Sequence, residues 1–241
     1  GGFLPFDGSP PEDPSAYVTE RFLSPGLIDH EDLARGSHCI APDYLEWSLD
    51  RSLENLGLDA IDLYYVHNPE TQLQARGREA VYDALEAAFR RLERRRADGD
   101  LRHYGVASWQ AFRVAPDEEA YLSLPEVYAR AEAAADAVGA DDCGFAAVQL
   151  PFNVLWADAV RTRAHPIGEG TAGKGANDAG AGDDAGGGGT NERTDQDGRT
   201  SALRWIQERG LAAFASATLA QGELAVPDAL PPAVAERLAG E

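Results

Sequence analysis

The segment from Leu49 to Pro69 constrains the fold of this chain more than any other stretch. Leucines at helical spacing precede Gly57, and an almost entirely apolar run over residues 61–67 follows. A short apolar run of this length is typical of a strand that is buried on both faces of a parallel sheet. The pattern predicts a helix that begins at Pro42 and ends at Gly57, then a strand that ends at His67.

The same alternation of strand and helix recurs along the chain. Further strand-length apolar runs lie at residues 102–108, 145–150 and 211–216. Helical patterns stand between them and end at Gly99, Gly139 and Gly210, and Thr200 or Ser201 can cap the last one. Regular alternation of this kind predicts parallel strands that are joined by right-handed crossover connections.

Three stretches do not follow this pattern. Residues 168–189 hold ten glycines and no large apolar side chain, so we expect a disordered Gly/Asp-rich insert, taken as 160–199 with its flanks. Residues 5–40 are rich in Pro, Gly, Asp and Ser, which predicts a long loop region with at most one short helix. The tail from Glu223 carries a helix start at Pro231 and Pro232.

The charge of the chain excludes some partners. Acidic residues number 41 against 21 basic ones, the net charge is −20, and Lys174 is the only lysine. Such a surface argues against nucleic acid or an anionic membrane as partner. No apolar run reaches the length of a membrane span and no signal peptide is present, so we expect a cytoplasmic protein. The charge favours a high-salt cytoplasm, with an ordinary acidic cytosolic protein as the alternative.

Salt should therefore stabilise the fold. If counter-ions screen the repulsion among these charges, the free energy of unfolding rises between low and molar salt. Urea unfolding at both salt concentrations measures this. A free energy that does not rise would contradict the high-salt interpretation.

Cysteine and histidine spacing predicts no metal site. Cys39 and Cys143 are far apart and lack CxxC spacing, so we expect reduced thiols. The remaining histidines have no ligand spacing with cysteine or acidic residues; they are His30, His38, His103 and His165.

His67 is the main candidate for chemistry. A histidine that ends a buried strand lies at the face where parallel barrels carry their active sites. A hydrogen-bonded core histidine is the alternative.

Four segments resemble motifs of the aldo-keto reductases. Residues 49–69 resemble S-L-x-x-L-G-L-D-Y-I-D-L-Y-x-x-H-x-P, and residues 99–109 resemble G-K-I-R-x-I-G-V-S-N-F. Residues 145–153 resemble V-x-Q-x-x-Y-N, and residues 210–222 align with G-I-P-V-I-A-Y-S-P-L-A-Q-G. The resemblance implies a (β/α)8 TIM barrel, incomplete, with about strands three to seven present. It identifies the chain as a fragment of a haloarchaeal-type homologue that forms one partial barrel over residues 1–241.

The resemblance also implies an activity and a site. The family reduces aldehydes or ketones by hydride transfer from NADPH, with NAD as an alternative cofactor, so the implied partner is a small-molecule carbonyl substrate. His67 corresponds to the catalytic histidine that polarises the carbonyl. The implied cofactor-binding residues are Ser108, Gln149, Ser216, Leu219 and Gly222. The chain departs from the pattern where Ala107 replaces a serine and Ser216 replaces the tyrosine that stacks on the nicotinamide.

Most of the family's catalytic tetrad has no match here. The family uses Asp, Tyr, Lys and His, and His67 alone is traceable. Lys174 lies in the Gly-rich insert, and Tyr64 and Tyr65 lie inside a strand. We therefore expect no turnover from this chain alone.

Two other functions remain open. The first is a non-catalytic nicotinamide-sensing or interaction protein on the same barrel, which the changes at Ala107 and Ser216 favour. A Thr-Lys pair just upstream of Gly1 would favour the enzyme instead. The second is an unrelated parallel barrel, such as a hydrolase, whose strand-end histidine binds metal. The substrate and the oligomeric state stay open.

Overall fold

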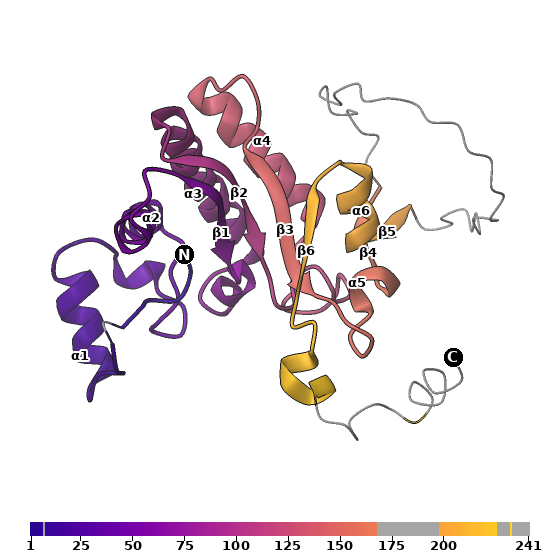
Figure 1. Cartoon of the computed structure of the whole chain (residues 1–241), viewed down its shortest axis with the longest axis horizontal. Coiled ribbons are helices and arrows are strands. Elements are labelled where there is room, and N and C mark those ends of the chain that lie inside the picture. Colours follow the sequence, from indigo (N-terminus) through magenta and orange to yellow (C-terminus); the bar gives the residue numbers. More distant parts are fainter. Residues whose placement is uncertain (7, 168–197, 226–231, 233–241) are drawn as a thin grey trace.

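Four parallel strands form the centre of the molecule. The computed structural model describes residues 1–6, 8–167, 198–225 and 232. The strands are β1 (Ile61–His67), β2 (Leu101–Ala107), β3 (Phe145–Pro151) and β6 (Ala212–Ser216), in the order β1-β2-β3-β6. All three pairings are parallel, which confirms the prediction from strand and helix alternation (Figure 1). In the described part of the chain the sheet has two edges, β1 and β6.

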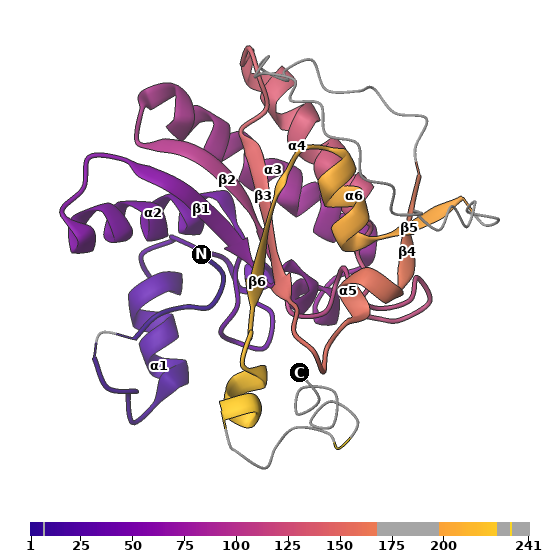
Figure 2. The ribbon, with the colours of Figure 1, turned by 45° about the vertical axis from the view of Figure 1, so that its right-hand side comes forward.

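Helices cover one face of this sheet (Figures 1 and 2). They are α2 (Pro42–Leu56), α3 (Arg78–Asp98), α4 (Leu124–Val138) and α6 (Ala202–Glu208). Gly57, Gly99 and Gly139 end the first three helices in the left-handed conformation, as their positions in the sequence predicted. Ser201 occupies the N-cap position of α6 but makes no capping hydrogen bond with its side chain.

The core lies between the sheet and the helices. Strand residues on the helix side are buried, among them Tyr64, Val66, Tyr104, Val106, Val148 and Leu150. They pack against apolar helix residues such as Leu49, Leu85, Phe89 and Val127. Gly105 lets β2 and β3 approach closely, because a Cβ atom there would lie 2.0 Å from the carbonyl oxygen of Ala147.

The N-terminal residues run beside β1. Gly1 donates its N–H to the carbonyl of Tyr65 over 2.9 Å, and the N–H of His67 donates to the carbonyl of Gly1 over 2.7 Å. Residues 5–40 contain more helix than the predicted loop: α1 (Pro14–Val18), a π-helical turn (Thr19–Leu23) and a 3₁₀ turn (His30–Asp32). Buried Val18 and Phe22 join this segment to the core.

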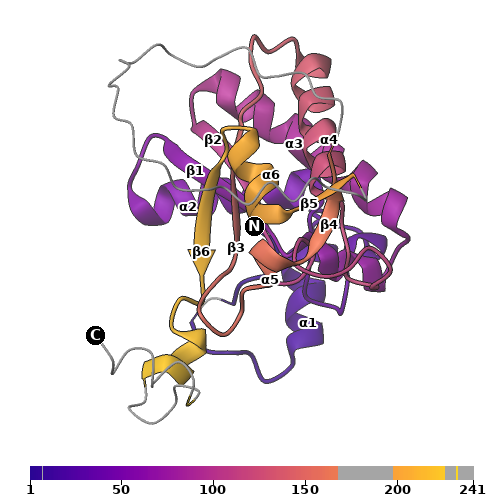
Figure 3. The same cartoon turned by 90° about the vertical axis from the view of Figure 1, so that its right-hand side faces the viewer.

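Ordered structure extends into both ends of the predicted insert 160–199. The short helix α5 (Asp158–Arg161) leads into β4 (Arg163–Pro166), which pairs antiparallel with β5 (Arg199–Ser201) beside α6 (Figure 3). Residues 168–197 lie outside the described residues, and so does most of the tail in which a helix start was predicted at Pro231 and Pro232. The 3₁₀ turns Pro69–Gln74 and Ala220–Ala225 follow β1 and β6.

Candidate active site

The strand ends bring several predicted residues onto one face of the sheet. The register pairs His67 with Ala107, Ala107 with Gln149, and Gln149 with Phe214. Residues paired in a parallel sheet point to the same side, here the side opposite the helices. Ser216 pairs with Pro151 two residues further on, so it shares this face. The structure therefore places His67, Gln149 and Ser216 on the same face of the sheet.

The backbone of His67 is held on both sides. Its N–H donates to Gly1, and its carbonyl accepts a hydrogen bond of 2.8 Å from Nε2 of His38. The imidazole itself is exposed and meets the ring of Phe3 edge-on at 5.8 Å between centroids. The covered part of the ring is desolvated, and the amino group of Gly1 lies nearby; both lower the pKa of His67, so the ring is neutral at pH 7 and keeps one N–H to donate.

His38 is a positioning residue that the sequence patterns did not reveal. It is fully buried, and its Nδ1 accepts a 2.9 Å hydrogen bond from Nε2 of Gln72. Because Nδ1 accepts, Nε2 carries the proton and donates to His67. Gly2 leaves room for this contact, since a Cβ there would lie 2.6 Å from the His67 carbonyl oxygen. Metal-ligand spacing gives no sign of this role of His38. Its burial in the folded protein does.

Ser108 lies in a different environment from the other predicted residues. It is buried, donates its hydroxyl to Oε1 of Glu70 over 3.1 Å and accepts from the N–H of Ala111 over 2.8 Å. One lone pair of the hydroxyl oxygen is left for a ligand. These two hydrogen bonds of Ser108 therefore hold the conformation of the loop that follows β2.

Glu70 is a second residue that sequence reasoning missed. Its Oε1 also accepts from the N–H groups of Trp109 and Gln110, at 2.8 and 2.9 Å. Burial raises the pKa of Glu70, while the hydrogen bonds that its carboxylate accepts act in the opposite direction. The sequence offers one sign of this role, because Glu70 is an acidic residue directly after the strand end at His67-Asn68-Pro69.

Gln149 and Ser216 keep their side chains free for a ligand. Neither makes a side-chain hydrogen bond to another described residue, and both are half-buried. Asn153, by contrast, joins the loops after β3 and β6. Its Oδ1 accepts from Leu155 and Trp156, and its Nδ2 donates to the carbonyl of Ala217 over 2.8 Å.

The loop that holds Leu219 and Gly222 has unusual backbone geometry. Ala217, Ala220 and Gln221 have positive φ angles of 51°, 48° and 59°, and Gly222 has a φ of 99°. A left-handed conformation costs about 1–2 kcal/mol for a residue other than glycine. Such residues cluster at functional sites. The N–H of Gly222 already donates to the carbonyl of Leu219, so it is not free to bind an anion.

The described residues provide no cluster of metal ligands. They contain no group of three or more His, Cys, Asp or Glu side chains placed to hold a metal ion. Cys39 and Cys143 are free thiols. None of the helices in that part of the chain is both long and apolar enough to cross a membrane.

A comparison with known protein families covers the first three of the four strand-end motifs. The sequence profile described as Aldo/keto reductase family matches residues 33–164. The curated protein "Aldo-keto reductase yakc (NADP(+))" of Schizosaccharomyces pombe is 69% identical over 26 residues, which are 11% of this chain and 8% of that protein. The solved structure of the glycerol dehydrogenase AKR11B4 from Gluconobacter oxydans covers 81% of this chain at 15% identity, with a TM-score of 0.45. This chain spans 39% of that structure's length.

Proposed function

Since the chain belongs to the aldo/keto reductase family, we propose that its strand-end face takes part in NAD(P)H-dependent reduction of an aldehyde or ketone carbonyl. The observation that carries this proposal is the register that puts His67 and Gln149 on one open face of the sheet. On this proposal the matched motifs correspond to about strands three to seven of a (β/α)8 barrel. The acidic composition supports a high-salt cytoplasm as its setting.

Each residue has a proposed role. His67 donates a hydrogen bond to the substrate carbonyl oxygen and stabilises the negative charge that develops there. Gln149 binds the carboxamide of the nicotinamide, and the free lone pair of Ser108 accepts from the same group. Ser216 and the loop of Leu219 and Gly222 contact the rest of the cofactor. NAD(P)H, when bound, supplies the hydride.

The chain alone should bind the cofactor without turning over substrate. The family's proton donor is a tyrosine beside a lysine, and neither has a match among the aligned motifs. Tyr64 is buried in the core with its hydroxyl on the carbonyl of Leu45, which removes it as a proton donor. Tyr65 faces the open side, but burial raises the pKa of its hydroxyl to about 12.

Fluorescence titration with NADPH tests the cofactor site. We expect Gln149→Ala to weaken binding about tenfold, the loss for a well-made hydrogen bond. Gln207→Ala, on the exposed side of α6, is the matched control and should bind like the wild type. Equal binding by all three proteins would overturn the cofactor assignment, and robust NADPH consumption with a panel of aldehydes would overturn the expected inactivity.

A non-catalytic nicotinamide sensor is the second candidate function. Two departures from the family pattern favour it: Ala107 replaces a serine, and the small Ser216 replaces the stacking tyrosine. The two functions differ in whether a carbonyl compound binds at His67. With NADP⁺ bound, the enzyme assignment expects butanal to bind, and His67→Gln to weaken that binding. A sensor binds no carbonyl compound at this position, and butanal titration then shows no saturation.

A further inference from the structure

A pocket opens near the strand end that carries His67, and neighbours of His67 line it. It has a volume of about 850 Å³ and lies between the connection that follows β1 and the loop that follows β2. Asn68, the residue after His67, lines it, and so does Phe3, whose ring touches the His67 ring. A substrate whose carbonyl is held by His67 can therefore extend its remaining atoms into this pocket.

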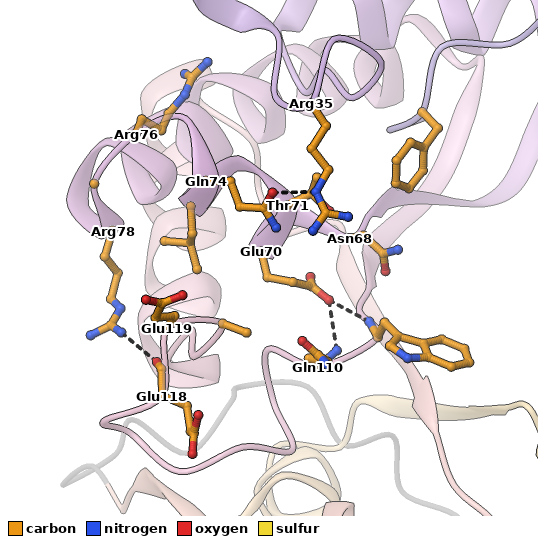
Figure 4. A pocket seen from close by; sticks show the side chains of 15 residues that line it. Arg35, Asn68, Glu70, Thr71, Gln74, Arg76, Arg78, Gln110, Glu118 and Glu119 are labelled. Atoms are coloured by element: carbon orange, nitrogen blue, oxygen red, sulfur yellow. Dashed lines mark hydrogen bonds between the residues drawn. The ribbon is translucent and has the colours of Figure 1, made fainter.

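The charged groups of the pocket are separated in space. Figure 4 shows Arg78, Glu118 and Glu119 together on one side, away from Arg35 and Asn68. Arg78 donates to the carbonyl of Glu118 over 3.2 Å. The side next to Asn68 thus carries the guanidinium of Arg35 and the carboxylate of Glu70, with Glu118 and Glu119 at the other end.

Arg35 lacks the carboxylate partners that arginines have elsewhere in this chain. Its Nε donates to Oε1 of Gln74, and no carboxylate of the described residues forms an ion pair with it. Arg130, by comparison, pairs with four carboxylates and Arg95 with three. In a chain with 41 acidic residues, an arginine that lines a pocket and has no carboxylate partner is available for an anionic ligand.

Glu70 also lines this pocket, but it makes no ion pair with Arg35. Its Oε1 is occupied by the three donors of the loop after β2, and the side chain is only 8% exposed. Asn68 and Gln110 add amide side chains that make no hydrogen bond to other described residues. The lining near Asn68 therefore combines the Arg35 guanidinium and neutral amide groups with one carboxylate, which three donors hold against the loop after β2.

The same short turn places both Arg35 and His38. Ala34 and His38 exchange two backbone hydrogen bonds of 2.9 and 3.0 Å, and Arg35 projects from the turn between them with a φ of 53°. His38 at the end of the turn donates to the carbonyl of His67. The position of the Arg35 backbone is thereby tied to the strand end that carries His67.

We propose that this pocket binds the anionic end, a carboxylate or phosphate group, of the carbonyl substrate through Arg35. The proposal rests on the proposed function for the link to His67, while binding of the anion itself does not depend on the cofactor. Arg35 acts as a specificity-determining residue, and Asn68 and Gln110 donate the further hydrogen bonds.

Calorimetric titration of the full chain without cofactor tests this proposal. Its probes are succinate, inorganic phosphate and uncharged succinamide. We expect at least one anion to bind about tenfold tighter than succinamide, and the preferred anion distinguishes the carboxylate from the phosphate source. Arg35→Gln should remove this preference, and Arg35→Lys should keep part of it, because it keeps the charge.

Arg94→Gln is the matched control, since Arg94 is an exposed arginine of α3 away from the pocket. It should bind the anions like the wild type, and thermal unfolding checks that all variants fold. Equal affinity for anions and succinamide, or unchanged anion binding in Arg35→Gln, would overturn the proposal. NADPH binding in the same preparation reports on the proposed function separately, so the two can fail independently.

Discussion

Acidification from pH 7 to pH 5 should destabilise the protein through two buried histidines, His38 and His165. Both side chains are fully buried, and burial lowers the pKa of each to about 4. The neutral rings are fully hydrogen-bonded. In His165, Nδ1 accepts from the N–H of Leu124 over 3.2 Å, and Nε2 donates to the carbonyl of Phe112 over 3.0 Å. A proton on Nδ1 would face the Leu124 donor and break this arrangement.

The direction of the effect follows from proton binding in the two states. An unfolded histidine takes up a proton near pH 6.5, whereas the folded protein holds these two neutral down to about pH 4. Their stabilisation is complete above pH 6.5 and is lost as the pH falls toward 4. Each histidine contributes a slope of up to about 1.4 kcal/mol per pH unit within that window.

Urea unfolding at constant salt between pH 7.5 and 5 measures this slope. Most carboxylates stay ionised in this range, and the buried amino group of Gly1, whose pKa burial lowers to about 5, adds to the slope equally in every variant. His38→Gln and His165→Gln should each show a shallower dependence than the wild type, whatever their absolute stability. His103→Gln removes an exposed histidine and should follow the wild type. Equal slopes in all four proteins would contradict the prediction.

Glu93→Ala should lower the free energy of unfolding by about 3–5 kcal/mol, the range for breaking a buried charge pair. Glu93 is 1% exposed on α3. Its Oε1 accepts from the hydroxyl of Tyr104 over 2.8 Å and from the N–H of Gly144 over 2.7 Å, and its Oε2 pairs with Arg96 over 2.6 Å. Its loss leaves a buried hydroxyl and a buried N–H without their acceptor.

Equilibrium unfolding in urea checks this value. Glu93→Gln keeps the shape and one carbonyl acceptor, so its loss should be smaller than that of Glu93→Ala. Asp98→Asn, an exposed change on the same helix, should stay within about 0.5 kcal/mol of the wild type. A Glu93→Ala protein as stable as the Asp98→Asn control would show that the buried carboxylate does not tie α3 to β2 and β3.

Local patterns predicted most of the sheet and its helices. The strand that ends at His67 was predicted to the residue, and the other three strands are displaced by at most one residue at either end. These elements follow hydrophobic spacing and glycine stops, which act over a few residues and do not depend on the rest of the chain. The helical turns in 5–40 and the β4–β5 pair were missed, because contacts with distant segments stabilise them.

The sequence by itself determined the strand and helix alternation, the family and the position of His67 at a strand end. Only the tertiary structure decided which side chains meet around the strand ends. It turned Ser108 toward Glu70, buried His38 behind His67 and left Arg35 facing a pocket without a carboxylate partner. Residues 29 to 39 positions apart make these contacts, and hydrogen bonds across such separations leave no periodic signal in the sequence.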